Sequence, residues 1–326
     1  MKSTLTKLLL MLAVISCYAQ PKGKTVKIDS FKSKFVQARN IEVWLPADYS
    51  TNTKESYPVL YMQDGQSIFY PETAIHKVAW EADDSAAKLI ASKRVKPFII
   101  VAIWSSDQRY MEYFPEKAAA NFTKTDKAIF DKTNETAKIK GTQLLGDEYL
   151  KFLTQELKPY IDKTYRTKAD AANTAICGSA MGALISLYAV CEYPNVFGKA
   201  ACMSTHWPLL ADNTHSGPSE AFKKYLYEKL PPFQDHSIYF DLGTKTMDQY
   251  YGEHQKTVDN IMKSKGYTDK NWLTKKFDGA AHVEKAWQER FIHPLMFIFK
   301  NEPKTIVKTL PKVTAKPTVK KAAKKQ

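Results

Sequence analysis

The sequence predicts an α/β fold, with a mostly parallel central sheet and helices on both faces. The first observation behind this prediction is that apolar, strand-like runs alternate with amphipathic helical stretches. The second is that several of these runs are continuously apolar, which suits strands covered on both faces. The expected strands are residues 41–46, 58–65, 98–104, 174–178, 200–204, 237–243 and 272–279. Ligands of such sheets bind beyond the carboxyl ends of the strands.

Two segments between and after these runs have helical periodicity. The first, residues 148–161, places apolar residues on one face, at Leu150, Leu153, Leu157 and Ile161. The second, residues 284–299, closes the body of the chain as its last helix. Residues 116–142 are polar without clear periodicity, so we expect an insertion near the mouth of the site. Residues 207–235 are expected to form a second excursion over the sheet.

The net charge of +14 is concentrated at the two ends of the 326-residue chain. Residues 301–326 hold eight lysines and one acid, Glu302, while residues 1–19 hold two lysines. The body, residues 20–300, is therefore only mildly basic and is expected to form one domain. The tail is expected to be disordered and either solubilising or adhesive to an anionic polymer or membrane surface. It has no aromatic residues to stack on bases, which argues against a nucleic-acid partner.

The first twenty residues have the features of an export signal. A basic start precedes an apolar run from Leu8 to Ile15 and small residues before Gln20. We expect a signal peptide over residues 1–19, cleaved after Ala19; the alternative is lipoprotein processing at Cys17. No other stretch reaches membrane-spanning length, so the mature protein is expected to be exported, whether periplasmic, secreted or lipid-anchored.

The remaining cysteines do not form a disulfide framework. Cys177, Cys191 and Cys202 are odd in number, and each lies in an apolar segment, where burial as a small hydrophobe is expected. Their spacing fits no metal site. We therefore expect neither a metal nor a cofactor.

The segment "GSAMG", residues 178–182, has the glycine spacing of a nucleophile elbow, G-x-S-x-G. In that turn a strand folds sharply into a helix, and flanking glycines are needed because a Cβ would clash. The central position, which holds serine in an active elbow, is Ala180. A frame shifted to Ser179 fails, because it would need glycines where Cys177 and Met181 stand.

Two further residues follow in the order expected of a catalytic triad, nucleophile, acid, histidine. Asp248 lies in a loop after the strand at 237–243, and Asp241 is the second choice for the acid. His282 lies on the loop before the final helix. Alternatively, His282 is a capping or surface histidine and Asp248 a solvated turn residue.

Six segments together resemble the putative-esterase family of α/β-hydrolases, which includes esterase D, enterochelin esterases and feruloyl or acetyl-xylan esterases. They are "LYMQDGQSIF", "AWEADDSAAKLI", "QRYMEYFP", "GDEYLKFLTQELKPYIDKTYRT", "ICGSAMGALISLYA" and "GAAHVEKAWQERF". The resemblance covers roughly residues 30–300 in the right order. It implies an α/β-hydrolase fold and a Ser-His-Asp mechanism. The sequence departs from the family pattern, G-S-S-M-G, at Ala180.

The resemblance also implies roles for other residues. The backbone N–H groups of Met181 and Gln66 would form the oxyanion hole. His282 would act as general base and then acid, while Asp248 would hold its tautomer. Glu284 and Trp287 are expected to support the histidine loop.

Four residues are candidates for the surroundings of the site. Arg109 and Glu112 could form a buried ion pair near it, with Arg109 available to the substrate. His206 and Trp207 point toward the same rim, where they either line the acyl or sugar pocket or simply pack.

Alanine cannot attack a carbonyl, so no acyl-enzyme can form. In a hydrolase of this type, loss of the serine costs on the order of 10⁶ in kcat and leaves about 10³–10⁴ over water. Three hypotheses follow: an impaired exported hydrolase of acylated saccharides or similar esters; a non-catalytic protein that binds an ester or carbohydrate; or an adhesive surface protein dependent on its tail. The substitution could be natural or introduced to trap substrate, and the export signal favours a natural sequence.

Overall fold

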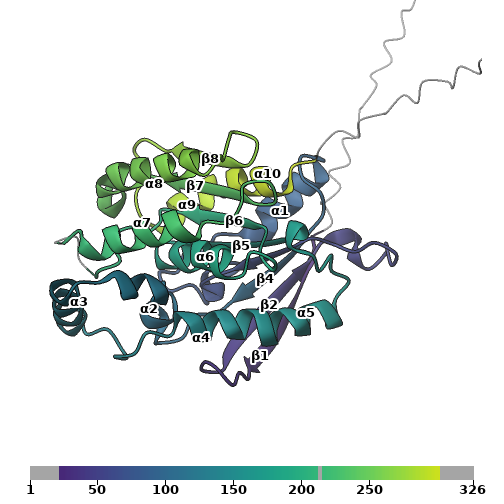
Figure 1. Cartoon of the computed structure of the whole chain (residues 1–326). Helices are drawn as coiled ribbons and strands as arrows, with labels where there is room; N and C mark the ends of the chain where they lie inside the picture. The colour runs from purple at the N-terminus through teal and green to yellow at the C-terminus, as the bar shows by residue number, and fades with distance from the viewer. Residues whose placement is uncertain (1–21, 212–214, 302–326) are drawn as a thin grey trace, which may run out of the picture.

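The computed structural model describes residues 22–211 and 215–301, which form one sheet with helices on both faces (Figure 1). The export signal with Cys17, and residues 302–326 of the basic tail, lie outside the described residues. The eight strands run in the order β1-β2-β4-β3-β5-β6-β7-β8. β1 and β2 pair antiparallel, as do β2 and β4, and all other pairs are parallel. The predicted fold class is confirmed.

Each predicted strand run corresponds to one strand. The strands are β1 (Lys24–Phe31), β2 (Arg39–Leu45), β3 (Val59–Met62), β4 (Ile99–Ile103), β5 (Thr174–Ser179), β6 (Lys199–Met203), β7 (Ser237–Leu242) and β8 (Trp272–Lys276). Only β1 was not expected. It is an edge strand whose residues are half-buried or exposed, so it lacks the continuous apolar run that marks the others.

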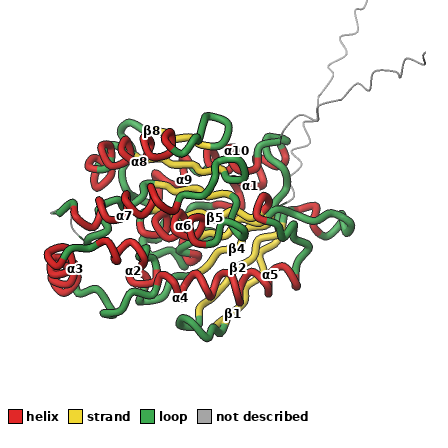
Figure 2. Tube along the Cα trace, viewed as in Figure 1, coloured by secondary structure: helices red, strands yellow, loops and turns green. Residues whose placement is uncertain are grey.

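The helices flank the sheet in two layers, as the secondary-structure colouring of Figure 2 makes clear. They are α1 (Ala82–Ala91), α2 (Arg109–Glu112), α3 (Lys124–Thr136), α4 (Gly146–Lys151), α5 (Lys158–Thr164), α6 (Met181–Glu192), α7 (Gly217–Lys229), α8 (Gly252–Ser264), α9 (Glu284–Arg290) and α10 (Ile292–Phe299). A π-helical turn, Phe152–Leu157, joins α4 to α5, so the helix expected over 148–161 is continuous.

The core has two parts, one on each face of the sheet. Alternate residues of a strand enter opposite parts: Val59 and Tyr61 pack on one side, Leu60 and Met62 on the other. Helices α5, α6, α7 and α8 contribute to the first part, and α1, α9 and α10 to the second. Burial of both faces explains why the strands are continuously apolar.

Residues 116–142 are more regular than the sequence suggested. They contain a 3₁₀ turn, Glu116–Asn121, and α3, which begins with a reciprocal capping box between Thr123 and Asp126. The helix was not expected because its surface is largely polar and only Phe130, Thr133 and Asn134 are buried.

The three cysteines of the described residues are free and buried, as expected. Burial raises the pKa of each thiol well above its usual value. Among the described residues, no helix combines the length and apolarity needed to cross a membrane.

Candidate active site

The turn between β5 and α6 has the backbone geometry of a nucleophile elbow. Ala180 lies at its apex with φ 54° and ψ −119°, a conformation that is strained for any residue with a side chain. A Cβ on Gly178 would lie 2.5 Å from the carbonyl carbon of Gly182, so glycine is required there. A Cβ on Gly182 would lie 3.1 Å from Cβ of Gln63. The two glycines thus permit the tight turn, as the sequence predicts.

Backbone hydrogen bonds hold the apex in place. The amide of Ala180 donates to the carbonyl of Met203 over 3.1 Å, and the Ala180 carbonyl accepts from the amide of His206 over 3.2 Å. Neither bond involves the side chain of residue 180. The elbow is therefore fixed by its backbone and its glycines.

The turn after β3 lies beside the elbow, because β3 and β5 are neighbours in the sheet. Gly65 approaches β4 so closely that a Cβ would lie 2.6 Å from the backbone of Ile103. Both polar atoms of the Gln66 side chain bond to Ser105. Nε2 donates to the Ser105 Oγ over 2.7 Å, and Oε1 accepts from the Ser105 backbone amide. Gln66 and Met181 thus both lie in helical turns that start at the carboxyl ends of adjacent strands. Their role as oxyanion donors stays a prediction.

The structure pairs His282 with Asp248. Nδ1 of His282 lies 2.6 Å from Oδ1 of Asp248, and its amide donates to Oγ1 of Thr246 over 2.8 Å. The ring also meets Trp287 edge-on, with ring centroids 5.0 Å apart. With Nδ1 engaged by the carboxylate, Nε2 is the nitrogen left for proton transfer in a triad.

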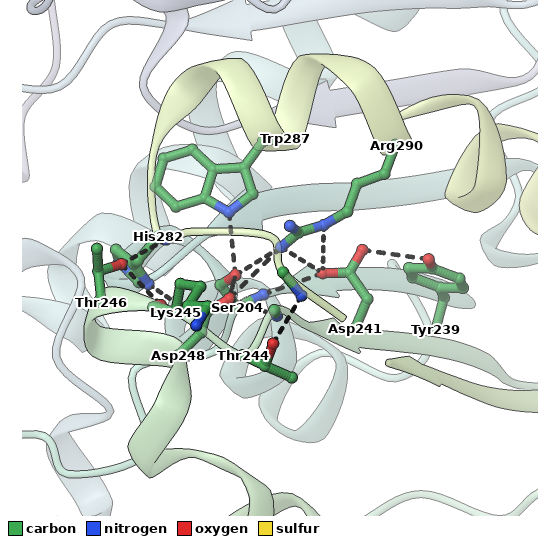
Figure 3. Close-up of polar contacts among 12 residues, drawn as sticks. Ser204, Tyr239, Asp241, Thr244, Lys245, Thr246, Asp248, His282, Trp287 and Arg290 are labelled. Atoms are coloured by element: carbon green, nitrogen blue, oxygen red, sulfur yellow. Dashed lines mark hydrogen bonds and ion pairs between the residues drawn. The ribbon is translucent and has the colours of Figure 1, made fainter. Parts of the chain in front are cut away.

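A buried polar network supports Asp248 from behind (Figure 3). Oδ2 of Asp248 accepts from Oγ of Ser204 over 2.6 Å and from the amide of Gly243 over 2.5 Å. Ser204 Oγ in turn accepts from Nε1 of Trp287 over 3.0 Å and from Nη2 of Arg290 over 2.6 Å. In Figure 3, Trp287 and Arg290 point from α9 toward Ser204.

The second candidate acid, Asp241, belongs to this buried network and is not the carboxylate paired with the histidine. Its Oδ1 is 3.0 Å from Nη2 of Arg290, and its Oδ2 accepts from the hydroxyl of Tyr239 over 3.1 Å. Complete burial raises the pKa of Asp241, and the nearby Arg290 charge offsets this only in part. Burial also disfavours the charge of Asp248, but the bond to His282 and its other donors leave the Asp248 pKa below the usual value. The geometry thus selects Asp248 over Asp241 as the partner of His282.

Ala180 and His282 line one cleft of about 570 Å³. Its apolar wall includes Ile75, Val78, Trp80, Val283 and Trp287, and its polar wall includes Asp64, His76, Arg109, Ser179, Glu284 and Lys285. The lining includes no residue of 116–142, which we expected at the mouth of the site. Among the described residues, no three His, Cys, Asp or Glu side chains are grouped as a metal site requires.

The predicted ion pair between Arg109 and Glu112 is wrong. Arg109 forms a bidentate pair with Asp64, with Nε 2.6 Å from Oδ1 and Nη2 2.7 Å from Oδ2. Glu112 pairs instead with the buried Arg39, whose Nη2 lies 2.7 Å from Oε1. The two residues lie on a helix of only four residues, and each finds a partner on a neighbouring segment. Arg109 nevertheless lines the cleft, as expected.

The structure does not place His206 and Trp207 in the lining of the cleft. Both are buried: His206 Nε2 lies 2.6 Å from the carbonyl of Leu210, and Trp207 Nε1 donates to Gln255 over 3.2 Å. His206 and Trp207 therefore pack in the interior, which is the alternative that the sequence left open. Of the two expected supports of the histidine loop, Trp287 contacts His282, whereas Glu284 lies 2.8 Å from His76.

Ser204, Arg290 and Asp64 belong to the site but were not predicted from the sequence. Ser204 follows β6 and Asp64 follows β3, so their position at the carboxyl ends of strands was an available signal. Arg290 is a charged residue on the same helix as Trp287, three positions on, and is only 3 % exposed. A buried arginine in an amphipathic helix indicates an acidic partner.

Comparison with known proteins shows which family the chain belongs to and which solved structures share its fold. A family model described as "Putative esterase" matches residues 33–298. "Uncharacterized protein YbbA" of Bacillus subtilis is 22% identical over 270 residues, covering 82% of this chain and 95% of that protein. A xylanase/feruloyl esterase of Xylanibacter ruminicola is 28% identical over 200 residues, but these cover 59% of this chain and only 22% of that protein.

Solved structures share the fold. A ferulic acid esterase has a TM-score of 0.61 at 21% identity, with 85% of this chain and 98% of the other covered. The enterobactin esterase of Shigella flexneri has a TM-score of 0.57 at 14% identity, covering 86% of this chain and 61% of that one. The family match spans most of the chain and includes every element of the cleft. The chain therefore belongs to the putative-esterase family and has the scaffold of a carboxylic ester hydrolase.

Proposed function

We propose that this protein binds a carboxylic ester in the cleft but forms no acyl-enzyme, because Ala180 stands where the mechanism of its family needs a serine. The observation that carries the proposal is the strained elbow at Ala180, with φ 54°, in the same cleft as the Asp248–His282 pair. A serine at this apex would present its Oγ into the cleft. The methyl group of alanine has no lone pair with which to attack a carbonyl.

The roles of the other residues follow from the family mechanism. His282 would take the proton of the nucleophile and return it to the leaving alcohol, with Asp248 stabilising the imidazolium. The amides of Met181 and Gln66 would stabilise the oxyanion of the tetrahedral intermediate. Without the nucleophile, these groups still favour binding of an ester carbonyl.

We propose an acylated saccharide or a related ester as the ligand. The cleft combines two tryptophans, Trp80 and Trp287, with the charged groups of Arg109 and Lys285. Such a lining suits an acyl group that is apolar or aromatic next to a polar alcohol. Relatives named as feruloyl or ferulic acid esterases support this choice.

The test compares three proteins on p-nitrophenyl acetate and a feruloyl ester: the parent, Ala180→Ser, and Ala180→Ser with His282→Gln. We expect Ala180→Ser to raise kcat on the order of 10⁴–10⁶-fold and the double variant to lose that gain. Calorimetry should detect binding of the feruloyl ester to the parent without turnover. A parent that already turns over quickly would mean that the nucleophile lies elsewhere.

The alternative is a decayed site that no longer binds esters. It predicts that the folded Ala180→Ser variant stays inert and that calorimetry detects no ester binding to the parent. The intact support of His282 by Asp248, Ser204 and Arg290 favours the first proposal over this one.

We also propose that the protein is exported. The basic start and apolar run of residues 1–19 support this proposal. N-terminal sequencing of protein from the periplasm, medium and membrane distinguishes cleavage after Ala19 from lipidation at Cys17. A cytoplasmic protein that retains Met1 would contradict export.

A further inference from the structure

The ester cleft carries two exposed aliphatic side chains on its lining. Ile75, from the segment before α1, is 58% exposed, and Val283, directly before α9, is 41% exposed. Both line the cleft that holds Ala180 and His282, and the half-buried Val78 continues the same apolar wall. Single exposed apolar residues are common on proteins, but two from distant segments that line one cleft form a surface for an apolar ligand.

One side-chain contact ties these two segments together. Residues 70–79, which we call the rim loop, contain no helix or strand. Within it, Nδ1 of His76 lies 2.8 Å from Oε1 of Glu284. His76 is the chain neighbour of Ile75, and Glu284 is the chain neighbour of Val283. The contact therefore fixes the spacing of the two segments that carry the exposed aliphatic side chains.

The rim loop is also attached at its base. Oγ1 of Thr73 donates to the carbonyl of Gln66 over 2.7 Å, and the amide of Trp80 donates to the carbonyl of Ser67 over 2.9 Å. The rim loop is thus bonded to the turn after β3 at its base and to α9 through His76. These bonds hold Ile75 at the cleft before any ligand arrives, which lowers the entropy cost of binding.

The aromatic residues of the cleft are already engaged inside the protein. Trp80 and Trp287 are buried, with ring centroids 5.9 Å apart, and Trp80 also meets Phe291 edge-on at 5.4 Å. Nε1 of Trp287 donates to Ser204 over 3.0 Å. The exposed apolar surface of the cleft is therefore aliphatic, and it presents no free aromatic face on which a ring could stack.

Resting on the proposed function, we propose that the acyl group of the ester is a medium-length alkyl chain, such as hexanoyl, and that Ile75 and Val283 select it. An acetyl group ends at the methyl next to the ester carbonyl, too short to reach side chains this exposed. An alkyl chain gains affinity by burying methylene groups against aliphatic side chains, about fourfold for each group. An aromatic acyl group gains most from a free ring face, which this cleft does not present.

The test measures binding of 6-O-acetylglucose, 6-O-hexanoylglucose and 6-O-feruloylglucose to the full chain by calorimetry. The three probes share one alcohol, so differences between them report on the acyl group. The rim variant carries Ile75→Ser and Val283→Ser. The control is Leu273→Ser, which shortens an exposed aliphatic side chain on β8, outside the lining of the cleft.

We expect the parent and the control to bind the hexanoyl ester at least about tenfold more tightly than the acetyl ester. In the rim variant this ratio should fall to within about threefold, with affinity for the acetyl ester unchanged. A merely structural role of the two residues would weaken binding of all three esters equally.

A second pair of variants tests the contact that positions the rim loop. Glu284→Ala removes the partner of His76, whereas Glu289→Ala removes an exposed carboxylate further along α9. We expect Glu284→Ala to weaken binding of the hexanoyl ester about threefold and to leave the acetyl ester unchanged. Glu289→Ala should change neither affinity.

The outcomes separate this proposal from the proposed function. A parent that binds the esters without preferring hexanoyl, or a rim variant with an unchanged ratio, would overturn the proposal and leave the proposed function standing. A loss confined to the feruloyl ester would overturn it in favour of an aromatic acyl group. Failure of the parent to bind any of the three esters would overturn both. If the rim variant does not fold, Ile75→Thr, which keeps the branched shape, should still lower the ratio about threefold.

Discussion

The ester cleft has two halves, the elbow and the histidine side. Different kinds of interaction hold them in place. The elbow depends on backbone: two glycines, a positive φ at Ala180 and main-chain hydrogen bonds. The histidine side depends on side chains, with Asp248, Ser204, Trp287 and Arg290 linked beneath His282. The residue at 180 can therefore change without moving the elbow. On the histidine side, each side chain supports the next.

The largest effect on stability should come from breaking the histidine side at Arg290. Arg290→Met leaves the buried carboxylate of Asp241, and the nearby one of Asp248, without their cation. We expect a loss of about 3–5 kcal/mol in the free energy of unfolding, measured with urea. Arg94→Met, at an exposed arginine, should change it by less than about 0.5 kcal/mol. Similar losses in both variants would mean that the network adds little to stability.

A pH-dependent effect should come from His206, whose amide bonds to the Ala180 carbonyl. Burial, assisted by the charges of His282 and Arg109, lowers the pKa of His206 to about 4. In the unfolded chain the ring protonates near pH 6.5, so its contribution is full above that pH and is lost as the pH falls toward 4. At about 1.4 kcal/mol for each pH unit between the two pKa values, the loss reaches up to about 3 kcal/mol.

The measurement is the free energy of unfolding of the parent and of His206→Gln at pH 7 and pH 4.5. The parent should lose more stability than the variant over this range. Identical pH dependence in the two proteins would show that His206 is not buried in its neutral form.

The elbow should be sensitive to a methyl group at its glycines. Gly178→Ala places a Cβ 2.5 Å from the Gly182 carbonyl carbon, and we expect a loss of about 1–3 kcal/mol. The matched change, Gly252→Ala, meets no atom within 4 Å and should be neutral or slightly stabilising. Thermal unfolding of both variants distinguishes the two cases, and an unchanged Tm for Gly178→Ala would contradict the close approach.

The smallest effect should come from relieving the strain at the apex. Ala180→Gly removes the Cβ that makes φ 54° unfavourable, so it should stabilise the fold by up to about 1 kcal/mol. Ala183→Gly, inside α6, should instead destabilise it by about 1 kcal/mol. Equal destabilisation by both changes would show that the apex is not strained.

The sequence predicted the fold well because both faces of the sheet are covered. Burial on both faces leaves continuous apolar runs, and only the half-exposed β1 lacks one. Helix α3 was missed because it is polar and short of buried residues, although Thr123 and Asp126 have the spacing of a capping box.

The site was harder to predict because it depends on contacts between distant segments. Gly178 and Gly182 are close in sequence, so the elbow could be recognised. Asp241 lies in β7 and Asp248 follows it, so the sequence offers both as the acid of the triad. Only the contact with His282 selects Asp248. Arg109 and Glu112 are near neighbours on α2, yet their partners are Asp64 and Arg39.

If the proposed function is right, the elbow lacks only a hydroxyl group at residue 180. The most direct test is a rapid-mixing experiment with p-nitrophenyl acetate on Ala180→Ser, followed by mass spectrometry of the quenched protein. We expect a burst of p-nitrophenol close to one equivalent and an acetyl group on residue 180, neither of which the parent gives. Absence of a burst in a folded Ala180→Ser variant, or acetylation at another residue, would contradict it.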